Sequence, residues 1–144
     1  MKHFSFIALI LTILAVFTTA ADKPASAIVF DSKVHEFGIV NHDGGPVRCE
    51  FSFTNTGDAP LVIVSANASC GCTQPKYSRD PVAPGKSGKI RVTFLPQTTV
   101  GNFSKTIKVR TNDPKNKKVV LRITGRVVPN AKDSDEKPAK PQKK

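Results

Sequence analysis

This 144-residue chain contains two cysteines separated by a single glycine. Their type and spacing are suited to disulfide, metal-binding or redox chemistry. Cys70 and Cys72 flank Gly71, and residues i and i+2 of an extended segment point to the same side, so both sulfurs can face one ligand. Two extended residues place their Cα atoms ~6.6 Å apart, near the upper limit for a disulfide. A bond between the two sulfurs therefore requires a local bend, and Gly71 is the residue expected to permit it.

Four interpretations of this cysteine pair remain open from the sequence. The first is a structural disulfide, either Cys70–Cys72 or one of them with Cys49, as is usual in an oxidising compartment. The second is a soft-metal site in which Cys70 and Cys72 hold Cu(I); zinc would need more ligands than this pair supplies. Apart from copper under this interpretation, no cofactor is expected. The third is a redox-active dithiol, although the Cys-x-x-Cys spacing is absent, and the fourth is a pair of inert thiols. Cys49 shares the parity of Phe51 and Phe53, so we expect it to face the core as a small apolar side chain.

The whole chain has a formal net charge of +11, and its positive charge is concentrated in the second half. From Ile28 to Ala68, two cations and five acids give −3, whereas from Ser69 to Val128 thirteen cations and two acids give +11. Seven of these cations fall on outward positions of the later strands and form an expected anion-binding face: Lys89, Arg91, Lys108, Arg110, Lys118, Arg122 and Arg126. The alternative is a solvated face that keeps the protein soluble.

The first 20 residues are typical of an export signal, with Lys2 and His3 before an apolar run, Phe4–Phe17, and small residues after it. This run is shorter than the ~20 apolar residues of a membrane span. We therefore predict cleavage after Ala20 or Ala21, no transmembrane span afterwards, and a periplasmic or extracellular location. The sequence Ala25-Ser26-Ala27 offers a second cleavage site, farther from the apolar run.

The remaining chain divides into a short linker, one domain and a tail. Residues 21–27 are assigned to the linker and residues 28–128 to a single domain. Residues 129–144 are rich in Lys and Pro and hold no large apolar side chain, so we expect a disordered tail.

Apolar and polar residues alternate with a period of two through the predicted domain, as in half-buried antiparallel strands. Seven short strands are expected, near residues 28–31, 36–40, 47–54, 61–64, 89–94, 106–110 and 118–124. Leu61–Val64 is apolar on both parities, which predicts a central strand covered on both sides. Turn residues separate the strands and no helical period is sustained, so we predict an all-β, immunoglobulin-like β-sandwich.

Three motifs carry a resemblance to a known family. The segment Phe53–Leu61, the sequence Ser69–Thr73 around Cys-Gly-Cys-Thr, and Pro84–Gly88 before Ile90–Phe94 are similar to those of the bacterial domain-of-unknown-function family fifteen seventy-three. A more remote similarity is to Hydin-type and major-sperm-protein-like Ig domains, which share the Asn-x-Gly turn. The resemblance implies an exported Ig-like domain with two notable cysteines and no settled reaction or ligand; Cys49 lies outside the motif.

The sequence favours binding over catalysis. It contains no constellation typical of a hydrolase, no phosphate-binding glycine loop and no HExxH zinc motif. We therefore expect a non-catalytic, exported binding or structural module of the cell envelope. Its partner would be an envelope protein, an acidic polysaccharide or an anionic membrane surface; nucleic acid is not expected, because of the export signal and the lack of interleaved aromatic residues. The alternative is a copper-handling or thiol-redox protein acting through Cys70 and Cys72.

Overall fold

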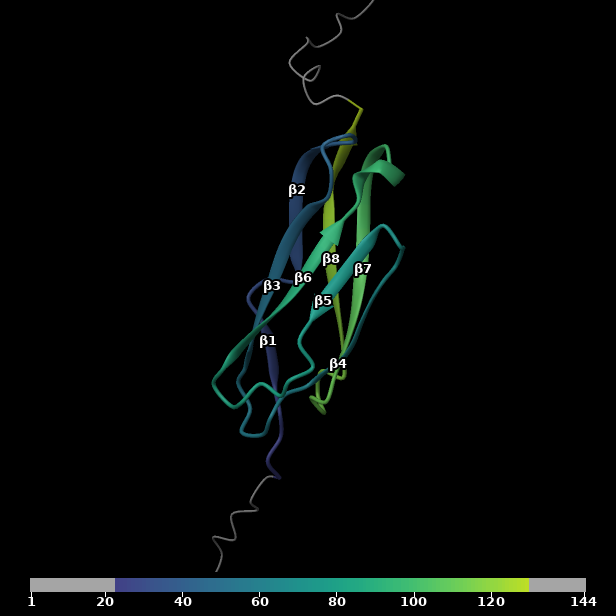
Figure 1. Ribbon diagram of the computed structural model, residues 1–144. Helices are drawn as coiled ribbons and strands as arrows, with labels where there is room; N and C mark the ends of the chain where they lie inside the picture. Colours follow the sequence, from purple (N-terminus) through teal and green to yellow (C-terminus); the bar gives the residue numbers. More distant parts are fainter. Residues whose placement is uncertain (1–22, 130–144) are drawn as a thin grey trace, which may run out of the picture.

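Two four-stranded β-sheets packed face to face make up the computed structural model, which describes residues 23–129 (Figure 1). Across sheet A the order is β1 (Ile28–Phe30), β3 (Val47–Asn55), β6 (Ser87–Phe94) and β5 (Thr73–Tyr77). Across sheet B the order is β2 (Val34–Asn41), β8 (Lys118–Val128), β7 (Gly101–Thr111) and β4 (Ile63–Ala68). Neighbouring strands are antiparallel except β2 and β8, which are parallel, and a short 3-10 turn, η1 (Pro96–Thr98), follows β6.

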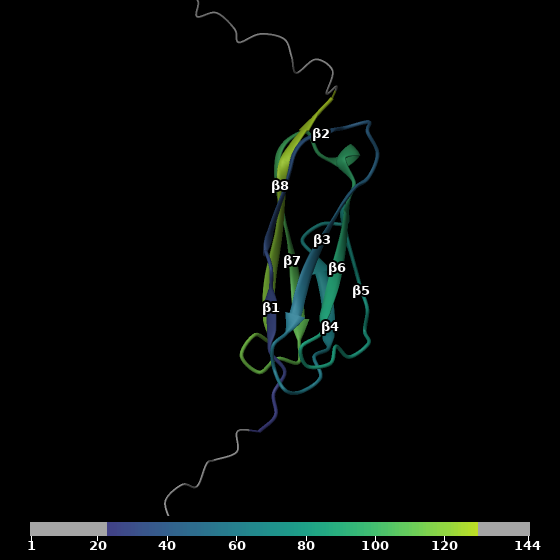
Figure 2. The same ribbon diagram turned by 90° about the vertical axis from the view of Figure 1, so that its left-hand side faces the viewer.

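The sandwich is elongated, and the two ends of the described chain lie at its opposite ends (Figure 1). Figure 2 shows β7 and β8 in one layer and β3, β6 and β5 in the other. The predicted signal peptide, residues 1–20, and all but the first residue of the predicted tail, residues 129–144, lie outside the described residues. Among residues 23–129, no helix is long and apolar enough to cross a membrane.

The predicted all-β, Ig-like sandwich is confirmed, with eight strands in place of the seven expected. The additional strand is β5, which pairs with β6 at the edge of sheet A. Its sequence, Thr-Gln-Pro-Lys-Tyr, lacks a clear apolar alternation and contains Pro75, which cannot donate a backbone hydrogen bond. Such a strand is tolerated at a sheet edge, and its sequence is hard to distinguish from a loop.

The prediction that Leu61–Val64 forms a central strand covered on both sides is wrong. β4 begins at Ile63 and lies at the edge of sheet B, while Leu61 makes an isolated bridge with Val82. Leu61 and Ile63 are buried, but Val64 is 52% exposed. Val64 is therefore a half-exposed aliphatic residue on the outer side of an edge strand, where a β-branched side chain fits the pleated, half-buried surface.

Inward-facing residues of both sheets fill the space between the layers. Ile90, Phe94, Ile107 and Leu121 are fully buried, and the ring of Phe94 stacks on that of Phe103 with centroids 4.2 Å apart. Since side chains alternate along each strand, the polar residues between them lie on the two outer faces of the sandwich. The two outer faces and the turns at the ends are thus the places where a site can form.

Candidate functional site

Cys70 and Cys72 lie in the turn that carries the chain from β4 in sheet B to β5 in sheet A. We call Cys70–Thr73 the cysteine turn. The Thr73 N–H donates to the Cys70 carbonyl at 3.2 Å, and the Cα atoms of the two cysteines lie 5.3 Å apart. Their Sγ atoms lie at bonding distance from each other. The bend that a bond between the two sulfurs requires is therefore present.

Gly71 does not provide this bend in the way the sequence suggested. Its φ lies outside the left-handed region, and a Cβ atom added to it would meet no atom within 4 Å. Other residues can therefore adopt the same conformation, and the bend is fixed by the hydrogen bond across the turn and by the anchored neighbours. Cys72 is 9% exposed and packs against the core, and the Leu95 N–H donates to its carbonyl at 2.8 Å.

Cys49 faces the core as predicted, with 7% of its surface exposed, and stands opposite Val92 of β6 rather than in the cysteine turn. Burial raises the pKa of its thiol to about 11, so the reactive thiolate is scarce at neutral pH. In the part of the chain that the structure describes, no group of three or more His, Cys, Asp or Glu side chains is arranged to hold a metal ion.

The expected anion-binding face is divided between the two sides of the sandwich. Lys89 and Arg91 belong to β6 and lie on the outer face of sheet A. Lys89 Nζ donates to Glu50 Oε2 at 2.8 Å, and Arg91 Nε donates to Glu50 Oε1 at 2.9 Å. These two hydrogen bonds lower the pKa of Glu50 below its usual range. Both cations thus have a carboxylate partner.

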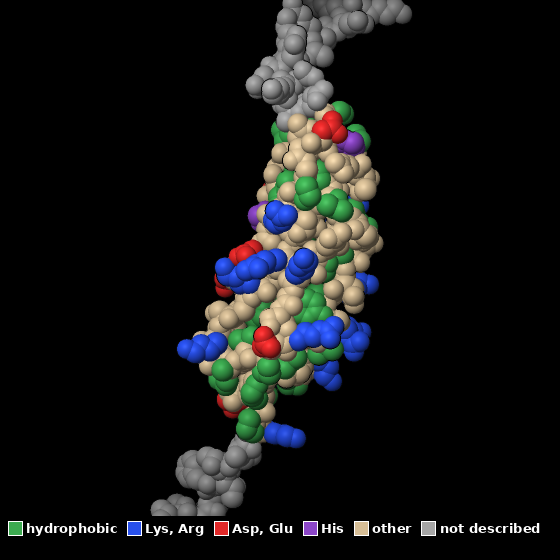
Figure 3. Space-filling view, in the orientation of Figure 1, with side chains coloured by type: hydrophobic (Ala, Val, Ile, Leu, Met, Phe, Trp, Pro, Cys, Tyr) green, Lys and Arg blue, Asp and Glu red, His purple; other side chains and the backbone are tan. Residues whose placement is uncertain are grey.

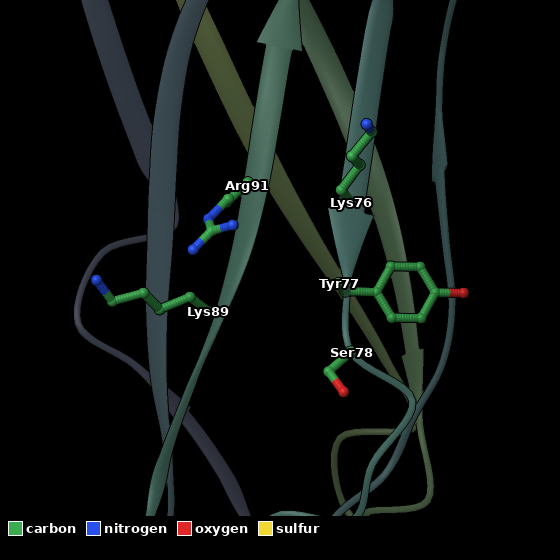
Figure 4. Close-up of a pocket in the computed structure, with 5 residues that line it drawn as sticks. All are labelled: Lys76, Tyr77, Ser78, Lys89 and Arg91. Carbon is green, nitrogen blue, oxygen red and sulfur yellow. The ribbon is translucent and has the colours of Figure 1, made fainter.

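A shallow hollow of about 290 Å³ lies beside this ion-pair cluster, lined by Lys76, Tyr77, Ser78, Lys89 and Arg91. Figure 4 shows Lys89 and Arg91 reaching from β6 toward β3, while the Tyr77 ring points to the opposite side. In Figure 3, drawn in the orientation of Figure 1, acidic side chains touch one group of basic side chains, and other basic side chains are spread over the surface. Two of the three cations that line the hollow are therefore held by Glu50 of β3.

The other five predicted cations share the outer face of sheet B, and we call this set the basic face: Lys108 and Arg110 on β7, and Lys118, Arg122 and Arg126 on β8. Arg110 stands opposite Lys118 in the register of the two strands. All five side chains are exposed. The ion pairs found among residues 23–129 are His42–Asp43, Lys89–Glu50 and Arg91–Glu50, and none involves the basic face.

Exposed aliphatic side chains lie among these cations, which the sequence reasoning did not anticipate. Val34 and Ile39 of β2 stand beside Arg122 and Arg126, and Val120 stands opposite Lys108. Together with Val64 of β4 they form a set of four; in the chain order Val34, Ile39, Val64 and Val120, these residues are exposed by 54%, 61%, 52% and 50%. The one signal in the sequence was Val120, where the apolar alternation of the last strand breaks.

A hollow of about 400 Å³ opens at one end of the same face and is lined by Gly38, Ile39, Gly125 and Arg126 among others. A Cβ atom on Gly125 would lie 2.9 Å from the Gly38 carbonyl oxygen, so this close approach of β2 and β8 requires glycine. Glu36 also lines the hollow and adds a carboxylate to this end of the face. The outer face of sheet B thus combines unpaired cations, exposed aliphatic groups and a shallow depression.

The two packed sheets and their strand order define the chain as an immunoglobulin-like β-sandwich domain. It is similar to the PapD-like domain 7 of human CEP192, with 14% identity and a TM-score of 0.55, over 76% of this chain and 91% of that one. It is also similar to the YadV chaperone, with 14% identity and a TM-score of 0.50, over 69% of this chain and 51% of that one. At such identities the likeness concerns the fold alone.

The chain belongs to the family described as "Protein of unknown function (DUF1573)", which matches residues 28–127. The family resemblance seen in the sequence motifs is thereby confirmed. A protein of unknown function from Porphyromonas gingivalis W83 has a similar structure, with 19% identity and a TM-score of 0.66. The likeness covers 76% of this chain and 51% of the Porphyromonas protein, so the chain spans about half that protein's length. No curated protein matches the chain.

Proposed function

We propose that this protein is exported and works without catalysis in the cell envelope, where the outer face of sheet B binds an anionic membrane surface. The observation that carries the proposal is the composition of that face. Five exposed cations that have no acidic partner among residues 23–129 lie among four aliphatic side chains that are each at least half exposed.

The cations of the basic face are suited to attracting an anionic bilayer. A Lys or Arg close to such a surface contributes about 1 kcal/mol of binding free energy, so five of them together contribute on the order of 5 kcal/mol before the costs of association. The attraction extends over a Debye length of about 10 Å at 0.1 M salt. Among residues 23–129 neither Arg122 nor Arg126 is paired with a carboxylate, and Arg122 donates only a long hydrogen bond of 3.5 Å to the Ser104 hydroxyl, so both can turn toward lipid head groups.

The aliphatic side chains favour a membrane over an acidic polysaccharide. Single exposed aliphatic residues are common on protein surfaces. Here Val34 and Ile39 stand directly beside Arg122 and Arg126, so one surface offers both apolar and cationic contacts. Membrane-surface binding uses this combination, since buried apolar area and electrostatic attraction to anionic lipids both contribute to it. A hydrated polysaccharide would use the cations and leave the aliphatic groups in water.

The export part of the proposal is supported by the N-terminal sequence and by the cysteine turn. Residues 1–20 have the pattern of an export signal. The two sulfurs of the cysteine turn lie at bonding distance, and we include in the proposal that they form a disulfide in the cell. Structural disulfides persist in the oxidising compartments outside the cytoplasm.

Vesicle flotation tests the proposal with defined probes. The exported chain is mixed with vesicles of pure phosphatidylcholine or of phosphatidylcholine and phosphatidylglycerol in equal parts. We expect binding to the anionic vesicles alone, and a decline in binding as salt rises from about 50 to about 500 mM. The double variant Arg122→Glu, Arg126→Glu is expected to reduce the bound fraction more than about tenfold.

A matched control distinguishes binding by the basic face from binding caused by the total charge of the protein. The double variant Arg48→Glu, Lys76→Glu makes the same charge change on the outer face of sheet A and is expected to retain most of the binding. Equal losses in both variants would refute a site on sheet B. Binding to soluble polygalacturonate without binding to anionic vesicles would assign the face to a polysaccharide instead. A further variant, Ile39→Ser, should weaken vesicle binding and leave any polygalacturonate binding unchanged.

A further inference from the structure

The segment just before β1 is docked into the turn that follows β3, although the sequence placed it in a linker. The Ala25 N–H donates to Asp58 Oδ1 at 2.7 Å, and the Asp58 N–H donates to the Ala25 carbonyl at 3.1 Å. The Thr56 N–H donates to the Ala27 carbonyl at 2.9 Å, and the Ala27 N–H donates to Asn55 Oδ1 at 3.3 Å. Residues 25–27 thus continue the antiparallel pairing of β1 with β3 beyond the end of the strands.

The docked segment explains why residue 57 is a glycine. Its φ lies outside the left-handed region, so the backbone conformation alone does not demand glycine. A Cβ atom at this position would lie 2.6 Å from the Ala27 nitrogen and would also overlap the Ala25 carbonyl oxygen. If the chain began at Ile28, no atom of residues 25–27 would exclude that Cβ. Gly57 is therefore explained by close approach of the N-terminal segment.

The loop between β7 and β8 holds the other side of the segment. Ser26 is 4% exposed, and its hydroxyl donates to Asn112 Oδ1 at 3.2 Å. The Ile28 N–H donates at 2.9 Å to Oδ2 of Asp113, which is 1% exposed. These side chains come from loops on both sheets, so the segment joins the two layers at one end of the sandwich. We call Asn55, Gly57, Asp58, Asn112 and Asp113 the N-terminal clamp.

We propose that residues 25–27 are a structural part of the mature domain, and that the leader is removed by a cut on the N-terminal side of Lys23. This inference rests on the proposed export. A signal peptidase would hydrolyse the peptide bond after Ala20 or Ala21. Water adds across this bond, so that the leader ends in a carboxylate and the mature chain begins with an ammonium group. The Ala25-Ser26-Ala27 sequence, which matches a cleavage pattern better, is not used. A chain starting at Ile28 would leave Asp58 Oδ1, Asn55 Oδ1 and the Thr56 N–H without these partners.

N-terminal sequencing of the exported protein, made from the full-length chain in a bacterium, tests the position of the cut. A mature chain beginning at Ala21 or Asp22 is the expected result. A chain beginning at Ile28 would overturn the inference while leaving export intact. A chain that retains Met1 would refute the proposed export and the proposed cut together.

Amide hydrogen exchange on the full chain tests the clamp independently of export. The amides of Ala25, Ala27 and Thr56 are expected to be protected, and Asp58→Ala should speed exchange at Ala25 by at least about tenfold, as for a lost hydrogen bond to a charged group. Gly57→Ala should lower the midpoint of thermal unfolding by several degrees. Gly71→Ala is the matched control, because its Cβ enters open space and should leave the midpoint unchanged. Equal midpoints for the two variants, with unprotected amides at residues 25 and 27, would refute the clamp.

Discussion

The N-terminal clamp and the basic face use polar side chains in opposite ways. In the clamp, Asn55 and Asp113 are almost fully buried and each accepts or donates several hydrogen bonds. On the basic face, Arg122 and Arg126 are exposed, and neither has a carboxylate partner. Buried polar groups are costly unless every partner is present, whereas exposed charges contribute little to folding.

This difference separates the residues that stabilise the fold from those available for binding. Changes in the clamp should reduce the free energy of unfolding and leave the binding surface unaltered. Changes on the basic face should do the reverse. Glu50 is intermediate in this respect, because it is exposed like the basic face but forms ion pairs with two cations of sheet A.

Replacing Asp113 by Ala should have the largest effect. The change removes the acceptor for the backbone N–H groups of Ile28, Lys115 and Asn116, and we expect it to reduce the free energy of unfolding by about 3 kcal/mol. Urea denaturation measures the loss. Asp31→Ala, at an exposed position, is the control and should change stability by less than about 0.5 kcal/mol. Similar losses in the two variants would show that the buried network is not the source of stability.

The pH dependence of stability should report the same carboxylate. Burial raises the pKa of Asp113, but the hydrogen bonds from Ile28, Asn116 and Lys115 outweigh it and hold the pKa below its ordinary value of 3.8. The unfolded chain therefore takes up a proton at a pH where the folded chain does not, and stability is lost as the pH falls from the ordinary value through the folded value. Urea unfolding between about pH 6 and pH 2 measures this loss.

Two variants show which carboxyl group causes the loss of stability at low pH. Asp113→Asn should make stability in this range less dependent on pH. Glu50→Gln should leave the dependence almost unchanged, although the pKa of Glu50 is also lowered, because solvent screens an exposed pair. A pH dependence that disappears with Glu50→Gln and persists in Asp113→Asn would reverse the assigned roles.

Counting the reactive thiols tests whether Cys70 and Cys72 of the cysteine turn form a disulfide. The expected effect of this bond on stability is intermediate in size. Native protein should show no reactive thiol at neutral pH, because Cys49 is buried and its pKa is about 11. Unfolding without reductant should expose one thiol, and reduction should expose three. Reduction should also cost about 1.5 kcal/mol of stability, as expected for so short a loop. Three reactive thiols in unreduced, unfolded protein would refute the disulfide and return the copper and redox interpretations, which measured copper content would then separate.

The smallest effects are expected from removing single carboxylates on the two outer faces. Glu36→Gln removes a negative charge beside Arg126 and should strengthen binding to anionic vesicles about two- to fivefold. Glu50→Gln makes the same charge change on sheet A and should alter binding by less than about twofold, with no change in the unfolding midpoint. Equal gains in both variants would mean that total charge, rather than the basic face, governs binding.

Much of the fold could be predicted from alternation, but the site could not. The alternation placed Phe51, Ile90 and Leu121 inside and the cations outside, because side chains of a strand point to opposite faces. It could not assign Lys89 and Lys108 to different sheets, since sheet membership depends on which distant strands pair. For the same reason it did not pair Glu50 with Lys89, 39 residues away.

Local sequence was least informative where a long-range partner decides the structure. β5 contains Pro75 and is a strand because β6 offers it an edge. Residues 25–27, Ala-Ser-Ala, are small and lack a large apolar side chain, so they resemble a linker; they are held in place because Asp58 and Asn112 accept their hydrogen bonds. Gly57 and Gly71 look equivalent in the sequence, yet only Gly57 has neighbours that exclude a side chain.

The sequence by itself determined the class of fold, the burial of Cys49 and the proximity of Cys70 to Cys72. All three follow from strand periodicity or from neighbouring positions in the chain. Only the tertiary structure decided which cations are paired, where the aliphatic residues gather and which glycine is required. These properties depend on contacts between residues tens of positions apart, which are fixed when the strands assemble into sheets and the sheets pack on each other.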